Sequence, residues 1–379
     1  MIESCSMPAE EDIKFMREAL KLAEKTRGLT SPDPMVGAVI VKNRKIISTG
    51  YHAEATTPHA ESWAIKKAGK YAFGATMYVN LEPCCFFVEK NNPPCTQAII
   101  NSGIKRVVAA IKDPNPSVSG KGFKELKEAG IEVVVGVLEE EAKILNEVFI
   151  KYITTKRPYV ILKAAMSLDG KIATKTGESF WITSIEARKK AHHLRNIVDG
   201  IIIGVNSAIK DNPELTVREF EGKTKNPKKI VLDPMARINI NSKILKIEPE
   251  NAIIVVSNKA PKQKIKKLKA KKANIIVAKS AKGRFNLDLL LKDLGERKIT
   301  SILIEGGGNT NALAIASGIV DKVVFFIAPK LIGGEKAKTP LEGEGEKFLA
   351  KAVKLKNLQV EKVGDDIMAV GYIELNRKL

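Results

Sequence analysis

A split set of metal-binding side chains constrains the fold of this chain more than any other feature of its sequence. His59 begins the tripeptide H-A-E, Cys84 follows Pro83, and Cys95 follows Pro94. One histidine and two cysteines supply three of the four ligands of a tetrahedral zinc ion, which leaves the fourth position for a water molecule. We therefore expect a fold that brings three separate segments of the chain to one point.

Glu61 adds a chemical function to this expected site. It lies two residues after His59, where its carboxylate can accept a proton from a zinc-activated water and pass it to a leaving amine. H-x-E followed by P-C and a second cysteine is typical of zinc deaminases that act on nucleobase-like rings. Two alternatives stay open: buried cysteines without a metal, or a structural zinc site with Cys85 or His52 as fourth ligand.

The chain of 379 residues is longer than one compact core usually is and predicts two domains. The polar segment T-T-K-R-P, which ends at Pro158, predicts a linker between domains at 1–153 and 158–379. No apolar run reaches the about 18 residues of a membrane span, and the start of the chain lacks the pattern of a secretory signal. Cysteines clustered near a histidine favour metal binding in a reducing compartment, so we expect a cytoplasmic protein.

The formal net charge of +20 lies in the second half of the chain, because acids and bases balance over residues 1–150. Much of the excess falls in the lysine-rich segment 262–272, which contains no aromatic residue. We interpret this segment as the solvated face of a helix, since binding of single-stranded nucleic acid also uses aromatic stacking. A small phosphorylated ligand would explain the positive charge, and nucleic-acid binding remains the alternative.

Strands alternate with helices in both halves, which predicts an α/β fold with a mixed sheet in the first half and a mostly parallel sheet in the second. Because Pro suits the start of a helix, Cys84 and Cys95 are each expected to open one, where the helix dipole favours a thiolate. The first half is expected to contain helices at 10–27, 59–68, 121–129 and 139–152, a hairpin at 36–49, and strands at 77–79, 106–111 and 131–137. The second half is expected to contain strands at 159–165, 200–204, 229–233, 253–256, 275–278 and 302–304, and helices at 186–196, 287–294 and 311–316.

A glycine-rich turn follows the strand expected at 302–304 and reads E-G-G-G-N-T from Glu305. Glycines between a strand and a helix let backbone N–H groups approach a phosphate, and the helix dipole adds to the attraction. The turn does not match G-x-G-x-x-G, so it does not indicate a Rossmann fold, and a turn without a ligand is the alternative.

The first half resembles the deaminase domain of the bifunctional deaminase/reductase of riboflavin biosynthesis. The matching stretches, over about residues 10–150, are S-P-D-P-M-V-G-A-V-I-V, G-Y-H, P-H-A-E, L-E-P-C, P-P-C and D-P-N-P-S-V-S-G-K-G. The resemblance implies a cytidine-deaminase-like α/β/α sandwich, one zinc ion on His59, Cys84 and Cys95, and Glu61 as the catalytic residue. The chain departs from the family at Asp33, where asparagine is usual, and in the loop 85–92, which replaces S-H-x-G-R-T.

The second half resembles the reductase domain of the same family, which is related to dihydrofolate reductase. The stretches L-K-A-A-M-S-L-D-G-K-I-A, G-E-S-F-W-I-T, N-S-A-I-K-D-N-P-E-L-T-V-R, I-E-G-G-G and A-P-K-L-I-G-G carry it from about residue 158 to 334. The resemblance implies NADPH as hydride donor, with phosphates on the turn and helix 306–313, and a phosphorylated ribosylaminopyrimidine as substrate. The implied cofactor contacts are Ala165, Trp181, Ser207, Asp211, Gly307, Gly308, Asn309 and Thr310. The implied substrate contacts are Ser179, Arg195, Leu215, Arg218 and Glu305.

Together these patterns predict a cytoplasmic enzyme that deaminates a diaminopyrimidinone and then reduces its ribosyl group to a ribityl chain. Lys163, on the first strand of the second domain, is a candidate proton donor for ring opening, with a buried ion pair as its alternative role. The resemblance implies a dimer formed through the second domain, and we expect neither nucleic acid nor membrane as a partner. Two other functions stay open: an enzyme with one active domain only, or a zinc protein that binds or deaminates nucleic acid.

Overall fold

The computed structural model describes residues 9–85, 94–218, 222–281 and 284–374. The chain divides into two compact units, Met1–Lys156 and Arg157–Leu379. Within the described residues, no helix is both long enough and apolar enough to cross a membrane.

The first unit is an α/β/α sandwich around one mixed sheet. Its elements are α1 Glu10–Glu24, β1 Gly37–Lys42, β2 Lys45–Tyr51, α2 Ala60–Ala68, η1 Gly69–Ala72, β3 Thr76–Leu81, α3 Cys95–Asn101, β4 Arg106–Ile111, α4 Lys121–Glu128, β5 Glu132–Val135, α5 Glu139–Leu145 and α6 Glu147–Thr155. The strand order is β2-β1-β3-β4-β5, in which β1 runs antiparallel to both neighbours and β3, β4 and β5 are parallel. The predicted sandwich with a mixed sheet is confirmed.

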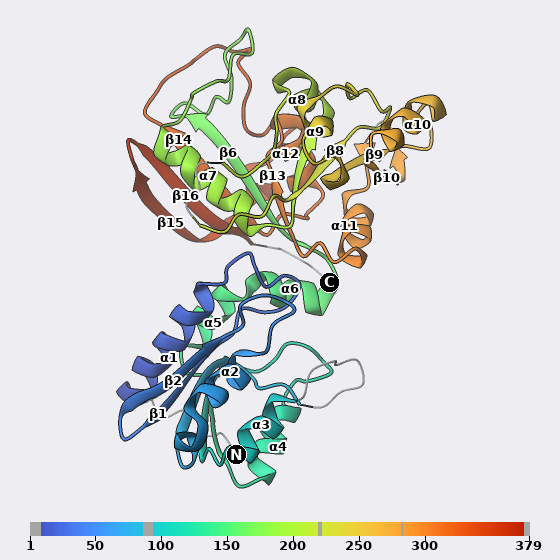
Figure 1. Ribbon diagram of the computed structural model, residues 1–379. Coiled ribbons are helices and arrows are strands. Elements are labelled where there is room, and N and C mark those ends of the chain that lie inside the picture. Colours follow the sequence, from blue (N-terminus) through green and yellow to red (C-terminus); the bar gives the residue numbers. More distant parts are fainter. Residues whose placement is uncertain (1–8, 86–93, 219–221, 282–283, 375–379) are drawn as a thin grey trace. The chain divides into compact units, whose positions relative to one another are not determined.

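Helices cover both faces of this sheet, which explains the continuous apolar runs of its central strands. Helices α1 and α5 pack on one face, and α2, α3 and α4 lie together on the other (Figure 1). Strands β1, β3 and β4 are buried along nearly their whole length, as expected where neither face meets water. The apolar runs therefore identified the strands, although they do not alternate between apolar and polar residues.

Two expectations for the first unit are wrong. Cys84 does not open a helix, because the chain after β3 is irregular through Cys85, and the rest of the loop expected at 85–92 lies outside the described residues. The helix expected at 139–152 is broken into α5 and α6 at Asn146. The buried side chain of Asn146 bonds the backbone N–H and carbonyl of Met35, at 2.9 and 3.0 Å, which holds it in a conformation outside the helix.

The second unit is built on a larger sheet. Its elements are β6 Tyr159–Ser167, α7 Ile185–Ile197, β7 Gly200–Gly204, α8 Val205–Asp211, β8 Lys228–Leu232, α9 Lys243–Lys246, η2 Pro249–Asn251, β9 Ala252–Val256, α10 Lys262–Ala270, β10 Asn274–Val277, β11 Ser280–Ala281, β12 Arg284–Phe285, α11 Leu287–Glu296, β13 Ser301–Ile304, α12 Gly308–Ala316, β14 Lys322–Ala328, η3 Leu349–Lys351, β15 Leu355–Val363 and β16 Asp366–Ile373. Nine of the described strands form one sheet in the order β10-β9-β8-β7-β13-β6-β14-β16-β15, and β11 and β12 pair with each other in a separate two-stranded sheet.

The sheet is parallel from β10 to β14, which confirms the mostly parallel arrangement, and β16 and β15 then add an antiparallel hairpin at one edge (Figure 1). No strand after β13 was expected. Strand β14 carries an apolar run that would have revealed it, whereas β15 is exposed at every position but its last and gives little apolar signal. The lysine-rich segment forms α10, of which only Leu268 is buried, so the interpretation as a solvated helix face is confirmed.

Candidate functional site

Three elements of the first unit bring the predicted zinc ligands to one place. His59 is the N-cap residue of α2, Cys84 follows the end of β3, and Cys95 is the first residue of α3. Helix α2 can approach β2 because Gly50 has no side chain: a Cβ atom there would lie 2.1 Å from the Ala60 carbonyl oxygen. The close packing of α2 on the sheet thus fixes where His59 and the first turn of this helix stand.

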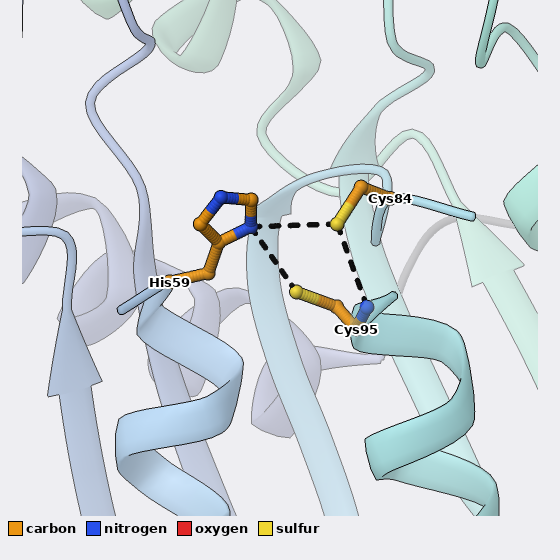
Figure 2. Close-up of side chains that lie close together, drawn as sticks. All are labelled: His59, Cys84 and Cys95. Carbon is orange, nitrogen blue, oxygen red and sulfur yellow. Dashed lines mark hydrogen bonds between the residues drawn. The ribbon is translucent and has the colours of Figure 1, made fainter. Parts of the chain in front are cut away.

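The three ligand atoms face one another with the spacing that zinc needs (Figure 2). His59 Nδ1 lies 3.2 Å from Cys95 Sγ and 3.4 Å from Cys84 Sγ, and all three ligand atoms lie within 4.8 Å of one another. Around a tetrahedral zinc ion with bonds of about 2.0–2.3 Å, such atoms are about 3.3–3.8 Å apart. The side chains present therefore fit zinc in both donor chemistry and separation.

Glu61 lies on the first turn of α2 beside this cluster and is almost fully buried, with 3% of its surface exposed. Its Oε2 atom has no hydrogen-bond partner among the described residues. Burial raises the pKa of the Glu61 carboxyl, and the Cys84 thiolate adds to this shift, while His59 and Cys95 oppose it. A buried carboxylate oxygen without a protein partner is suited to accept a proton from a small ligand or a water molecule.

Neither alternative fourth ligand joins the cluster. Within the described part of the chain, the group of possible ligands contains only the three predicted side chains. His52 is buried with its ring nitrogens near Asp33 Oδ2, at 3.3 Å, and the Pro58 carbonyl oxygen, at 3.4 Å. Cys85 is buried, and burial raises the pKa of its thiol. A site with three protein ligands and one open position is the arrangement of catalytic zinc rather than of structural zinc.

The second unit contains a cavity of about 1070 Å³ at the carboxyl ends of β6, β7 and β13. The glycine-rich turn after β13 forms part of its wall, and α12 begins within it at Gly308. The turn can pack closely against the first residues of α12 because Gly306 has no side chain: a Cβ atom there would lie 2.6 Å from Thr310 Cβ. Ligands of parallel α/β sheets bind at this end of the strands.

Most of the residues predicted to bind the cofactor or substrate line this cavity. They are Ala165, Ser179, Ser207, Asp211, Glu305, Gly307, Gly308, Asn309 and Thr310, and Lys163 lines it as well. Four predicted residues that the structure describes do not line it: Trp181, Arg195, Leu215 and Arg218.

These four residues have different surroundings. Leu215 is buried, and Arg218 is about half exposed and pairs with Glu214 at 2.6 Å. Trp181 is 65% exposed and stacks on Arg188, whose guanidinium carbon lies 4.0 Å from the ring centre, so a core position for Trp181 is excluded. An exposed aromatic face is available to a bound ring system.

Glu305 links Arg195 to the cavity through a buried ion pair. Arg195 donates two hydrogen bonds to its carboxylate, at 2.7 and 2.8 Å, and Lys163 Nζ lies 3.9 Å from Oε2. Burial opposes the charge on Glu305, but Arg195 and Lys163 outweigh it and lower the pKa of this carboxyl to about 2. Burial also lowers the pKa of Lys163, with Glu305 opposing and Arg195 reinforcing the shift.

A carboxylate that sequence reasoning missed lies at the start of α12. The backbone N–H of Glu342 donates to the Gly308 carbonyl at 3.1 Å, and its carboxylate accepts from Asn309 Nδ2 at 2.7 Å and pairs with Lys338 at 3.3 Å. Glu342 follows β14 and reaches α12 only through the fold, so no local motif marks it. It brings a negative charge to the turn expected to hold phosphates.

Comparison with known proteins gives the same division of the chain into two kinds of domain. The family model described as cytidine and deoxycytidylate deaminase zinc-binding region matches residues 9–111, and that of the RibD C-terminal domain matches residues 158–369. The chain is 47% identical to the riboflavin biosynthesis protein RibD of Aquifex aeolicus over 96% of this chain and 98% of that protein. It is 37% identical to RibD of Escherichia coli over 94% and 98% of the two chains.

Solved structures agree over nearly the whole length. RibD of Acinetobacter baumannii matches with a TM-score of 0.87 and 35% identity over 96% of this chain and 99% of that one. A deaminase/reductase of Thermotoga maritima matches with a TM-score of 0.82 and 35% identity over the same shares. The deaminase domain uses zinc, the reductase domain uses NADPH, and the substrate class is that of small pyrimidines. The chain therefore belongs to the RibD family and is a bifunctional riboflavin biosynthesis enzyme with an N-terminal deaminase domain and a C-terminal reductase domain.

Proposed function

We propose that the chain deaminates 2,5-diamino-6-(5-phosphoribosylamino)pyrimidin-4-one and then reduces the ribosyl group of the product to a ribityl chain. The relative from Thermotoga maritima is described as the diaminohydroxyphosphoribosylaminopyrimidine deaminase and 5-amino-6-(5-phosphoribosylamino)uracil reductase. The observation that carries the proposal is the three-ligand cluster beside a buried carboxylate oxygen without a partner. A pocket lined with polar and glycine residues in the second unit supports the second step.

His59, Cys84 and Cys95 would hold one zinc ion, and when bound it would supply a water molecule with a pKa lowered to ~7. Glu61 accepts the proton that this water loses as its oxygen adds to the amino-bearing ring carbon. The same carboxyl then delivers the proton to the amine, which leaves as ammonia. Burial favours this exchange, because the raised pKa of Glu61 brings the carboxyl closer to neutral pH.

In the second domain, backbone N–H groups of the turn from Gly307 to Thr310 would hold the phosphates of NADPH, and Ala165, Trp181, Ser207 and Asp211 would contact the rest of the cofactor. When bound, NADPH would supply the hydride for the reduction.

The same domain binds the substrate through Ser179, Arg195, Leu215, Arg218 and Glu305. Lys163 gives a proton to the ring oxygen of the sugar as the anomeric carbon is reduced, so the ring opens to a ribityl chain. The position of Lys163 in the cavity wall, with its ammonium 3.9 Å from Glu305, supports this role.

We assign the deaminase to residues 1–153 and the reductase to 158–379, supported by the division of the structure between Lys156 and Arg157. A cytoplasmic location suits three cysteines that form no disulfide among the described residues. We further propose a dimer through the second domain, because β15 is an edge strand with exposed Leu358 and Val360. Nucleic acid is not proposed as a partner, since the lysines of α10 have no aromatic neighbours in sequence.

Two variants of the full-length enzyme test the assignment. Glu61→Gln should abolish ammonia release from the diaminopyrimidinone and leave NADPH oxidation with the deaminated substrate unchanged, because glutamine cannot take up the proton. Lys163→Met should abolish NADPH oxidation with the deaminated substrate and leave ammonia release unchanged. Ammonia release that survives Glu61→Gln would overturn the mechanism. If the wild-type enzyme bound zinc but released no ammonia, only the reductase half would stand.

A further inference from the structure

Glu82 makes an unusual set of contacts for a residue outside the zinc cluster. It lies between the end of β3 and Pro83-Cys84, and only 2% of its surface is exposed. Its Oε2 accepts hydrogen bonds from the backbone N–H groups of Asp113 at 3.0 Å and Gly120 at 2.8 Å. Its Oε1 accepts from the N–H groups of Gly122 at 2.9 Å and Phe123 at 3.3 Å. One buried carboxylate thus meets four backbone donors, two of which belong to the first turn of α4.

The start of α4 is also pressed directly against the segment that carries Cys84. A Cβ atom on Gly122 would lie 2.1 Å from the Pro83 carbonyl oxygen, so only glycine fits there. The first N–H groups of a helix have no partners within the helix, and a negative charge at this end is favourable. Glu82 supplies both the acceptors and the charge, which fixes the Cys84 segment to α4.

A second carboxylate joins the same helix to the other cysteine. Glu125, one turn along α4, accepts a hydrogen bond from Thr96 Oγ1 at 2.8 Å and another from the side-chain amide of Gln97. Thr96 directly follows Cys95 and is fully buried, and its backbone N–H donates to the Cys84 carbonyl at 3.2 Å. Helix α4 is therefore bonded at its first turn to the Cys84 segment and through Glu125 to the start of α3.

We propose that Glu82 and Glu125 are positioning residues of the zinc site, which use α4 as a common support to set the separation of Cys84 and Cys95. The backbone N–H of Cys95 donates to Cys84 Sγ at 3.5 Å, a contact that holds only while the two segments keep their register. Neither carboxylate belongs to the ligand cluster. Both act through the segments that carry the thiolates.

Substitution of Glu82 by glutamine should be disruptive, because all its partners are N–H donors and a side-chain amide would turn its own donors towards two of them. Glu125→Ala removes the contact to α3, whereas Glu125→Gln keeps one acceptor oxygen. Glu128→Gln is the matched control, because Glu128 lies on the same helix in an exposed pair with Lys124.

The proposal rests on the deaminase role of the site, so the experiment measures metal binding separately from ammonia release. Zinc affinity of each full-length variant is determined by competition with a chromophoric chelator, and the visible spectrum of the cobalt-substituted protein reports ligand geometry. Glu82→Gln and Glu125→Ala should weaken zinc binding about 10-fold and alter the cobalt spectrum. Glu125→Gln should recover most of the affinity, and Glu128→Gln should match the wild type.

A role in stability alone predicts a different outcome. If both disruptive variants unfolded at lower temperature but bound zinc within twofold of the wild type, with an unchanged cobalt spectrum, the proposal would be overturned. If Glu82→Gln failed to fold, Glu125→Ala and its rescue by Glu125→Gln would decide alone. Zinc affinity lost in these variants, together with normal ammonia release at saturating zinc, would support positioning and leave the proposed reaction intact.

Discussion

At the scale of single residues, the buried charges around Lys163 control when this side chain can act as an acid. Its pKa lies below the ordinary value of 10.5, chiefly because burial disfavours the charged ammonium. The carboxylate of Glu305 stabilises that charge, and the guanidinium of Arg195 destabilises it. The two neighbours therefore act on the same proton in opposite directions.

This opposition predicts two opposite shifts in the pH profile of NADPH oxidation with the deaminated substrate. The rate of the wild-type enzyme should fall on the alkaline side with a midpoint below 10.5, as Lys163 loses its proton. Glu305→Gln should move that midpoint to lower pH, and Arg195→Leu should move it to higher pH, whatever either does to the maximum rate. Three identical midpoints would show that Lys163 is not the acid.

The ion pair between Arg195 and Glu305 also predicts that the folded protein loses stability in acid. The stability of the Glu305 and Arg195 variants therefore has to be measured as a control for their activity. The folded-state pKa of Glu305, about 2, lies below its ordinary 4.5, so its stabilising effect is present above about pH 4.5 and is lost as pH falls towards 2. Because breaking a buried pair costs about 3–5 kcal/mol of folding free energy, the unfolding temperature of each variant should be recorded beside its activity.

At the scale of elements, the start of α12 carries both the turn that we propose to bind the cofactor phosphates and a competing negative charge. The carboxylate of Glu342 accepts a hydrogen bond from Asn309, and its side chain lies against Gly308, where a Cβ atom would lie 2.4 Å from Glu342 Cγ. Cofactor phosphates that approach this turn meet a like charge, which is partly neutralised by Lys338. The turn is therefore less attractive to anions than its glycines suggest.

Glu342→Gln should tighten NADPH binding roughly threefold, since removal of one partly exposed like charge is worth on the order of 0.5–1 kcal/mol. The gain should shrink at high salt, because mobile ions screen the repulsion. Titration of NADPH by fluorescence measures this, with Glu335→Gln as the control, since Glu335 lies in the same connection and does not line the cavity. Weaker binding of NADPH by Glu342→Gln would mean that the carboxylate holds its segment in a binding-competent form.

The sequence predicted the elements whose signals are local. Apolar runs bounded by turns identified β7 and β9 because both faces of these strands are covered, and the P-C motif placed Cys95 at the start of α3. It failed at Cys84, where the chain stays irregular after β3 although a proline precedes the cysteine. The roles of Glu82 and Glu342 depend on partners far along the chain, and no spacing rule for a single helix or strand contains them.

At the scale of the whole molecule, the metal site and the cavity proposed to bind NADPH each lie within one compact unit. The three zinc ligands lie at the start of α2, after β3 and at the start of α3, and the described residues that line the cavity all follow Arg157. Each site is thus formed by described residues of a single unit. The two activities should therefore respond independently to loss of their cofactors.

Removal of zinc by a chelator should abolish ammonia release and leave NADPH oxidation with the deaminated substrate within about twofold of its original rate. It should also lower the unfolding temperature of the first unit only, because a bound metal stabilises the folded state that binds it. Calorimetry of the treated and reconstituted protein would test this. A parallel loss of reductase activity, restored by zinc, would contradict the independence of the two sites.

The position of β6 within its sheet has a consequence for how the protein folds while it is synthesised on the ribosome. The described strands of the first unit have all been synthesised once Val135 is added, so this unit can close its sheet while the rest of the chain is still being translated. Strand β6 opens the second unit but pairs with β13 and β14, which are synthesised near the end. Both edges of β6 therefore stay unpaired until the last quarter of the chain is being synthesised, so chaperone protection during synthesis matters most for the reductase half.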